Sequence, residues 1–409
     1  MPTNTRRPRR CSGTRRTTEL TSNGPTLDRP EAPALHEPVY GAPGQTRTVT
    51  AQPTDRTTPL LLQGQEYVFR APIAALDFQE QVHRLDLVDP GDGDPEPCVL
   101  VLARSADMEM NELSIALAEL GVRMARIDID RCMDLSLTVY PDAPLVELDR
   151  WILRPLLVWR RHFEFAALPV DPGTLYGAYV ADQWRSVADW ITHRADWAQV
   201  NSLATGRQPD RLTQLSDAAM FGLRIPRTVV TTRPARHRPG GSLCVVKTSG
   251  RHLIEPASGV QHGLFPRPLD PRRGGGDPEP APVIVQQYVH SDYELRVFVV
   301  GERLISYRVD KLDPAQLWVD PDAVEVRSIE LPAGLGTTLL ALARFWKLDV
   351  AAFDLLMTDG APVFLEVNIN CDWRWFERRC AEPTGSASAP VSQAVAQWVA
   401  ERFGQLRRA

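Results

Sequence analysis

The sequence predicts an α/β protein with a disordered N-terminal tail, and three observations lead to this prediction. Residues 98–129 contain an apolar run, a stretch with apolar side chains at helical spacing and a second apolar run, the order of a parallel strand–helix–strand unit. Two more apolar strands, at 351–358 and 362–368, flank an Asp-Gly turn. Residues 1–65 are rich in Pro, Thr, Arg and Gly and nearly devoid of aromatic residues, so we expect them not to fold.

The composition excludes several classes of protein. The length of 409 residues predicts two or three domains, and the net charge of −5 is too small to indicate a nucleic-acid or membrane partner. No apolar run approaches the length of a membrane span. The six cysteines include no Cys-x-x-Cys pair, which argues against zinc and a disulfide framework. The early arginines are not followed by the apolar segment of an export signal, so we expect a cytoplasmic protein.

The hairpin at 351–368 carries polar residues inside apolar strands, where a carboxylate is costly to bury unless it is paired or bound to a metal. A two-residue loop at Asp359-Gly360 would place Asp354 opposite Leu365. A three-residue loop that includes Ala361, with Gly360 in a left-handed bulge, would place Asp354 opposite Glu366. We expect the three-residue loop.

Three oxygen-bearing side chains would then share one face of this hairpin. Asn368 joins Asp354 and Glu366 because side chains two residues apart on a strand point to the same side. Carboxylate and carboxamide oxygens suit Mg²⁺, which commonly binds one or two carboxylates together with substrate phosphates. The alternative is a hairpin whose acids lie at an exposed edge, and the spacing alone leaves both open.

The pattern of Asp354 followed by Glu366-Val367-Asn368 resembles the magnesium-binding end of the ATP-grasp ligases. With the aromatic residues of 373–375, it resembles the branch that modifies ribosomal peptides, the microviridin-type (graspetide) synthetases related to RimK-type glutamate ligases. The resemblance implies an ATP-grasp fold, in which an N-terminal α/β domain precedes two α+β subdomains that sandwich the nucleotide. The domain ranges it implies are 1–65 for the tail, then 66–195, 196–288 and 289–409.

The resemblance also implies roles for residues outside the hairpin. Lys247, at the end of an apolar strand, matches the lysine that contacts nucleotide phosphates, and Arg211 stands near a position where a lysine is expected. Arg296, in a Glu-Leu-Arg string, matches a residue that contacts the phosphates or the reacting carboxylate. A string at the end of the next strand matches the hinge that grips adenine: Gln286, Gln287, Tyr288 and Val289.

The activity implied by the resemblance needs ATP and Mg²⁺. A substrate carboxylate takes the γ-phosphate to give an acyl phosphate, and an amine or hydroxyl then displaces phosphate to form an amide or ester. The implied substrate is a precursor peptide recognised through its leader. Two alternatives remain: a ligase joining an amino acid to a small carboxylate, and a nucleotide-binding regulatory protein without turnover. The sequence also leaves open whether the protein forms a homo-oligomer.

The sequence departs from the family pattern after the metal ligands. Ile369, Cys371 and Asp372 replace the usual Pro, Gly and Gln, which puts the substrate in more doubt than the nucleotide. Upstream, Trp159-Arg-Arg161 resembles a segment near the end of the first domain in the same branch. Five tryptophans gather in that region, and they form either a hydrophobic core or a peptide-docking platform: Trp151, Trp159, Trp184, Trp190 and Trp197.

Overall fold

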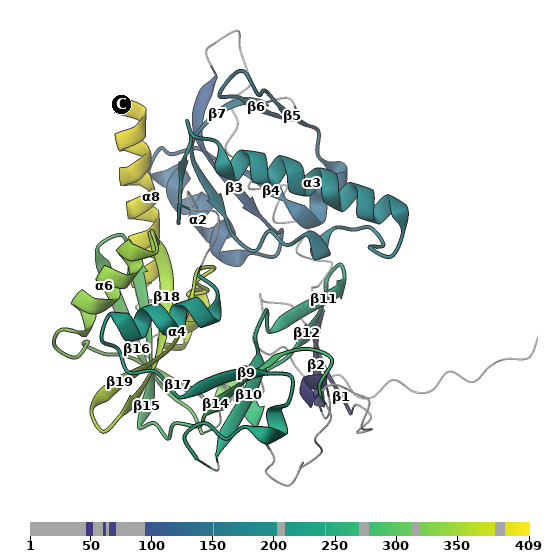
Figure 1. The fold of residues 1–409 in the computed structure, drawn as a ribbon. Coiled ribbons are helices and arrows are strands. Elements are labelled where there is room, and N and C mark those ends of the chain that lie inside the picture. Colours follow the sequence, from purple (N-terminus) through teal and green to yellow (C-terminus); the bar gives the residue numbers. More distant parts are fainter. Residues whose placement is uncertain are drawn as a thin grey trace, which may run out of the picture. The chain divides into compact units, whose positions relative to one another are not determined.

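The computed structural model is drawn in Figure 1. The residues it describes are 46–51, 60–62, 65–70, 95–149, 151–202, 209–241, 243–269, 278–312, 320–380 and 389–409. Contacts divide the chain into Met1–Ala34 and Leu35–Ala409, and every described residue belongs to the second unit.

The first sheet is built around a parallel α/β unit. Its strand order is β4-β3-β7-β6-β5, with β8 paired to β7. β3 pairs in parallel with both β4 and β7, as the strand–helix–strand pattern predicts. The strands are β3 (Glu96–Ala103), β4 (Met124–Asp128), β5 (Leu137–Val139), β6 (Val146–Leu148), β7 (Trp151–Arg160) and β8 (Ala198–Gln199).

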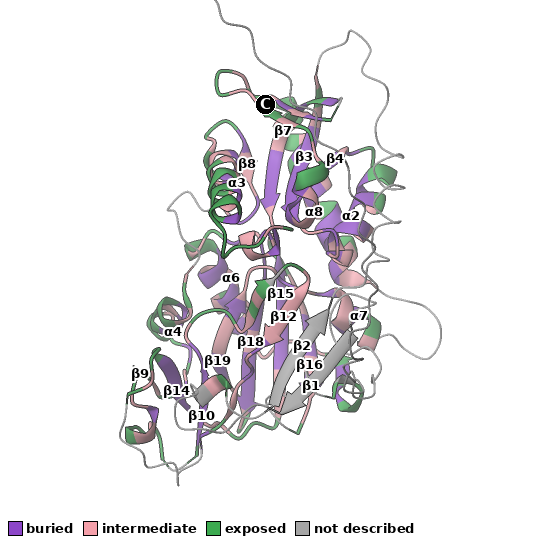
Figure 2. Ribbon diagram, turned by 90° about the vertical axis from the view of Figure 1, so that its right-hand side faces the viewer, coloured by how far each residue is buried: buried purple, intermediate pink, exposed green. Residues whose placement is uncertain are grey.

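Helices cover both faces of this sheet. α2 (Met108–Glu119) begins at Asp107, whose side chain accepts a hydrogen bond from the backbone N–H of Met110. α2 and the C-terminal helix α8 (Pro390–Arg408) belong to one hydrophobic cluster with β3 and β7, and α3 (Leu175–His193) belongs to the cluster on the other face. Figure 2 shows the buried strands β3 and β7 between these helices.

The tryptophans of this region are part of the core. Trp151, Trp159 and Trp197 are each less than a tenth exposed. Trp184 and Trp190 are partly buried against the hydrophobic cluster that contains Trp151 and Trp197. The interpretation of these tryptophans as core residues is confirmed for the three buried ones. Trp159 also stacks on Trp373, with ring centroids 6.5 Å apart.

A second sheet, antiparallel and ordered β13-β10-β14-β9, carries Lys247. Its strands are β9 (Thr228–Thr231), β10 (Cys244–Thr248), β13 (Arg267–Pro268) and β14 (Val283–Gln287). Lys247 lies opposite Ile284 in the β10–β14 pair.

A third sheet includes residues of the N-terminal segment that was expected not to fold. Its order is β1-β2-β12-β11, formed by β1 (Thr46–Ala51), β2 (Gln65–Arg70), β11 (Leu253–Ala257) and β12 (Val260–Gly263). Residues 46–51 and a short 3-10 turn, Leu60–Leu62, therefore have regular structure inside the range expected to be disordered. Backbone pairing with a neighbouring strand supplies the stability that this Thr-rich segment lacks by itself. β2 begins at Gln65, the last residue of the expected tail, and the rest of that tail lies outside the described residues.

The fourth sheet is antiparallel, with the order β17-β16-β15-β18-β19. Its strands are β15 (Tyr293–Val300), β16 (Arg303–Asp310), β17 (Glu325–Ser328), β18 (Val350–Thr358) and β19 (Ala361–Asn368). α4 (Arg211–Met220) and α6 (Leu335–Phe345) pack against one face of this sheet and share a hydrophobic cluster with it. α8 contacts β15 and β16. The short helices are α7 (Arg374–Cys380), η3 (Ile129–Asp134), η4 (Phe165–Ala167), η5 (Pro234–Arg236) and η6 (Pro321–Ala323).

Two further observations concern the helices and the cysteines. Among the described residues, no helix combines the length and the apolar character that crossing a membrane requires. The cysteines in this part of the chain are free thiols: Cys98, Cys132, Cys244, Cys371 and Cys380.

Candidate functional site

The β18–β19 hairpin places Asp354 directly opposite Glu366, as the sequence predicts. The loop that joins the two strands is different from the one expected. Thr358 pairs with Ala361, so the loop has two residues, and both have positive φ, 52° at Asp359 and 70° at Gly360. This is the geometry of a type I′ turn, which Asp-Gly favours. The expected three-residue loop is therefore wrong.

A β-bulge restores the register that this two-residue turn would otherwise lose. Leu355 pairs with Phe364 and Asp354 pairs with Glu366, so Leu365 has no partner on β18. Phe364 and Val367 consequently belong to the same hydrophobic cluster although they are three positions apart, an offset that places residues on opposite faces of a regular strand. Glu366 is thereby moved to the face of Asp354.

Arg296 extends this polar row onto a third strand. It lies opposite Asp354 in the β15–β18 pair, and its Nη1 donates to both carboxylate oxygens at 2.8 Å. On the other side, Asn368 Nδ2 donates to Asp354 Oδ2 at 2.6 Å. Directly opposed residues share a face of a sheet, so Arg296, Asp354 and Glu366 form one row across three strands.

Arg211, at the start of α4, joins Glu366 to the second sheet. Its Nε lies 3.1 Å from Glu366 Oε2, and its Nη1 donates to the carbonyl oxygens of Thr248 and Gly250. Lys247 precedes Thr248 and is buried, and the charges of Glu366 and Arg211 both act on it. The structure thus gathers Arg211, Lys247 and Glu366 from three separate stretches of chain.

The protonation of these groups follows from burial and their neighbours. Burial raises the pKa of Asp354, and Glu366 adds to this, although Arg296 opposes it. Burial would also raise the pKa of Glu366, but Arg211 and Lys247 outweigh burial and hold that pKa below its usual value. Burial lowers the pKa of Lys247. Glu366 is therefore the more firmly ionised carboxylate of the pair.

The donor set fits a hard divalent cation. Asp354 and Glu366 supply carboxylate oxygens on one face, and Asn368 would present Oδ1 after its amide turns over. The described residues contain no cluster of three or more His, Cys, Asp and Glu that could hold a metal. Two carboxylates and a carboxamide suit Mg²⁺ better than zinc, because Mg²⁺ fills its remaining positions with water and phosphate oxygens.

The residues expected at an adenine hinge lie at the end of β14. Some of their polar groups form hydrogen bonds with other residues of the protein. Gln286 is buried and its Nε2 donates to Thr228 Oγ1 at 2.8 Å. The backbone N–H of Gln287 donates to the Arg227 carbonyl, and that of Tyr288 donates to the Leu243 carbonyl. Val289 is half-buried beside them. A role in nucleotide binding stays a prediction for all four.

A second polar cluster, which the sequence did not predict, adjoins this row. Asp372 Oδ1 accepts hydrogen bonds from Arg161 Nη2 at 2.6 Å and lies 2.8 Å from His162 Nε2. Arg161 is fully buried, and its Nε donates to Asp107 at 2.8 Å. In the sequence, Asp372 is marked only by its departure from the family pattern, and Arg161 only by the resemblance of Trp159-Arg-Arg161 to a family segment. The pairing spans 210 positions of sequence, so local patterns carry no signal for it.

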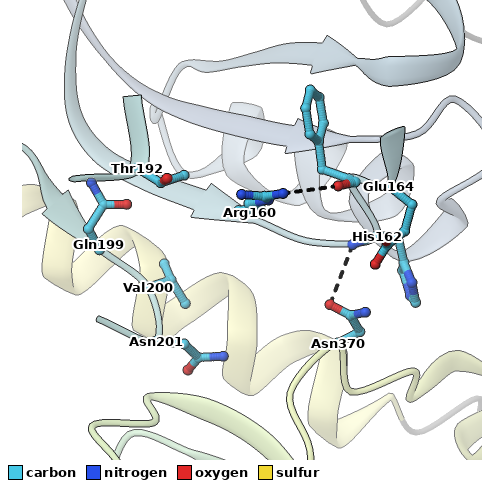
Figure 3. A pocket seen from close by; sticks show the side chains of 9 residues that line it. Arg160, His162, Glu164, Thr192, Gln199, Val200, Asn201 and Asn370 are labelled. Carbon is cyan, nitrogen blue, oxygen red and sulfur yellow. Dashed lines mark hydrogen bonds between the residues drawn. The ribbon is translucent and has the colours of Figure 1, made fainter. Parts of the chain in front are cut away.

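A polar cavity of about 250 Å³ lies at the end of β7, and His162 and Asn370 are part of its wall (Figure 3). The backbone N–H of His162 donates to Asn370 Oδ1 at 3.4 Å. The other lining residues are Arg160, Phe163, Glu164, Thr192, Gln199, Val200 and Asn201.

Comparison with solved structures identifies the fold. Macrocyclase MdnC from Microcystis aeruginosa MRC, bound with precursor peptide MdnA, matches with a TM-score of 0.60 and 20% identity over 73% of this chain and 98% of that one. A Chryseobacterium gregarium RiPP-associated ATP-grasp ligase, in complex with ADP and a leader and core peptide, has a TM-score of 0.60 and 18% identity over 76% and 97%. ATP-grasp ligase PsnB, complexed with minimal precursor, Mg and ADP, has a TM-score of 0.57 and 18% identity over 73% and 96%.

These matches show that the chain has the ATP-grasp fold, as the sequence predicted. No protein-family model matches the sequence, and no curated protein does. At identities of 18–20% the likeness establishes the fold, and the activity must be argued from this chain's own residues.

Proposed function

We propose that this protein is an ATP-dependent ligase that activates a carboxylate as an acyl phosphate and joins it to an amine or hydroxyl group. The observation that carries the proposal is the pairing of Asp354 with Glu366 on the ATP-grasp fold, with Arg296, Arg211 and Lys247 around them. Two acids and three cations on one site suit a nucleotide whose phosphates are negative and whose metal ion is positive.

Each residue has a distinct part in this proposal. Asp354, Glu366 and Asn368 would hold Mg²⁺, which when bound neutralises the β- and γ-phosphate oxygens. Lys247 and Arg211 would bind phosphate oxygens from the side of the second sheet. Arg296 would orient the reacting carboxylate or phosphate, because a planar guanidinium binds either with two parallel hydrogen bonds. The protein positions reactants and neutralises charge, and it needs no nucleophile of its own.

The nucleotide would lie between the second and fourth sheets. Lys247 comes from one, the Asp354–Glu366 pair from the other, and Arg211 contacts both. This arrangement supports a boundary between 196–288 and 289–409, with Gln286, Gln287, Tyr288 and Val289 at that boundary near the adenine. The range 66–195 stays our proposal for the preceding domain, although β2 at its start pairs with β12. α4 precedes the second sheet in the chain but packs on β19, so the two subdomains share a helix.

We further propose that the substrate is a ribosomal precursor peptide recognised through its leader, with amide or ester cross-links formed from Asp or Glu side chains. Three proteins of the same fold support this, because their structures contain a precursor, leader or core peptide. The free cysteines of the described residues fit a reducing compartment, and we place the reaction in the cytoplasm.

The test uses a synthetic precursor peptide, chosen from the short reading frames beside the gene by its repeated Thr, Ser or Lys together with Asp or Glu. Incubation with ATP and Mg²⁺ should release ADP and phosphate and remove one water from the peptide for each bond formed. Mass spectrometry and an ADP assay measure the two products. Transfer of a free amino acid to the peptide would favour the ligase alternative, and ATP binding without ADP release would favour a regulatory protein.

A further inference from the structure

His162 and Asp372 form a pair that the roles above do not use. His162 Nε2 lies 2.8 Å from Asp372 Oδ1, and the same oxygen accepts from Arg161 Nη2 at 2.6 Å. Arg161 is itself held by Asp107 and lies over the Trp373 ring at 4.9 Å. The carboxylate of Asp372 is thus fixed by a buried guanidinium, and it in turn fixes the imidazole ring.

This pair adjoins the Asp354–Glu366 site. Arg296 Nη2 reaches the backbone carbonyl of Asp372 at 3.5 Å while its Nη1 binds Asp354. His252, which contacts Arg211, is influenced by the charges of Glu366, Asp372 and His162. Through Asp372, His162 is therefore one residue removed from Arg296, which is proposed to orient the reacting group.

Backbone geometry shows that the contact is held against local preference. His162 and Cys371, which precedes Asp372, both have left-handed backbones, with φ of 51° and 56°. A residue with a side chain rarely adopts this conformation, and such strain persists where the surrounding structure enforces it. The polar cavity described above has His162 in its wall.

We propose that His162 takes the proton from the attacking amine or hydroxyl group in the second half of the ligase reaction, and that Asp372 is the positioning residue that holds its ring. This inference rests on the proposed function. The acceptor nitrogen or oxygen forms a bond to the acyl carbon, and the bond from that carbon to the phosphate oxygen breaks. Phosphate leaves with the electron pair of that bond, and the acceptor's proton passes to His162 Nδ1 and then to solvent.

The tautomer required by this step follows from the contacts. With Asp372 ionised, Nε2 of neutral His162 carries the hydrogen and donates it, which leaves Nδ1 as the proton acceptor. Burial alone would lower the pKa of His162, but the Asp372 carboxylate and its hydrogen bond outweigh burial and raise it. Asp372 contacts the ring, and the charges of Arg161, Asp107 and His252 also act between these groups and His162.

Hydroxylamine separates the two halves of the reaction, because it attacks an acyl phosphate without a protein base. The wild-type protein and His162→Gln are incubated with ATP, Mg²⁺ and the synthetic precursor peptide, with and without hydroxylamine. We expect His162→Gln to form hydroxamate at close to the wild-type rate and to form cross-links at least ~100-fold more slowly, the usual scale for losing a general base. His193→Gln, an exposed histidine on α3, is the matched control.

The pH profile tests the role of Asp372. The wild-type cross-linking rate should rise with pH through a pKa above the usual 6.5 of histidine. In Asp372→Asn this rise should move to lower pH, because the group that raises the pKa of His162 is gone, and the maximal rate should fall. A residue with only a structural role would lower the rate without moving the profile.

Three results would overturn the inference. They are wild-type cross-linking by His162→Gln, equal loss of hydroxamate and cross-links in that variant, and an unmoved pH profile in Asp372→Asn. Failure of the proposed function is distinguishable, because the wild-type protein itself would then form neither hydroxamate nor ADP.

Discussion

Asp354 lies opposite Glu366 only because Leu365 has no partner across the hairpin. The two-residue turn at Asp359-Gly360 would, in a regular ladder, send Glu366 to the opposite face of the sheet. The bulge at Leu365 returns it, and both carboxylates face the cations of the site. The site therefore depends on one irregular residue in β19, and bulges are often found beside active sites.

Replacing Glu366 by Gln should abolish turnover and leave the fold intact. The substitution keeps the size of the side chain and removes a charge proposed to hold Mg²⁺ against the phosphates. We expect peptide-dependent ADP formation to fall by at least ~100-fold, the scale of losing one electrostatic stabiliser. The protein should remain folded, with a somewhat lower thermal midpoint because the ionised carboxylate that Arg211 and Lys247 stabilise is lost. Glu330→Gln, at an exposed position, is the control, and wild-type turnover in Glu366→Gln would remove this residue from the metal site.

Replacing Lys247 by Met should weaken ATP binding without destabilising the protein. Lys247 is buried and burial lowers its pKa, so the cation is kept in an unfavourable environment. Loss of one charged hydrogen bond corresponds to about 1.5–3 kcal/mol, or roughly 10- to 100-fold in affinity. Calorimetry with ATP and Mg²⁺ measures this.

The control for Lys247 is Lys347→Met, because Lys347 is exposed. The thermal midpoint of Lys247→Met should equal or exceed that of the wild type, since a buried charge is replaced by an apolar chain of similar length. Equal ATP affinity in the wild type and Lys247→Met would contradict the assignment.

Replacing Gly360 by Val should lower stability and spare the activity of the folded molecules. Gly360 has a φ of 70°, and a side chain there would meet no atom within 4 Å, so the cost comes from the backbone alone. A β-branched residue in this conformation should cost about 1–2 kcal/mol. Activity should persist because the bulge, and not the turn, places Glu366 opposite Asp354.

Urea unfolding and ADP formation measure these two effects for Gly360→Val. Gly360→Asn is the matched control, since Asn tolerates a left-handed backbone better than Val. Loss of activity in a folded Gly360→Val protein would show that the turn also controls the register.

The contribution of His162 to stability should depend on pH. Its folded pKa is raised above 6.5, so the stability gained from its contact with Asp372 is fully present below that value and is lost as the pH rises through the folded pKa. Asp372 stays ionised in this range because its own pKa is held well below its usual value: burial alone would raise it, and the charges of His162 and Arg161 outweigh burial.

Thermal midpoints of the wild type and His162→Gln should therefore differ more at mildly acid pH than at mildly alkaline pH. His193→Gln should show no such trend. A gap that widens toward alkaline pH would mean that His162 contributes as the neutral ring.

The sequence by itself determined the local features of this protein. Apolar patterning gave the parallel unit of β3, α2 and β4, and the spacing of Val391, Val395 and Val399 predicts the buried face of α8. α4 begins at Asp210, whose side chain accepts hydrogen bonds from the backbone of the first turn. These features are set within a few residues of sequence, because side-chain spacing and caps act over one or two turns.

Only the tertiary structure decided how distant residues meet. The pairing of Arg296 with Asp354 depends on β15 lying beside β18, and that of His162 with Asp372 joins the first sheet to the segment after β19. A sequence pattern that assumes strict alternation of faces does not predict the bulge at Leu365. The packing of Phe364 and Val367 into one core selects it, because both apolar side chains are buried only if one residue between them is left out of the ladder.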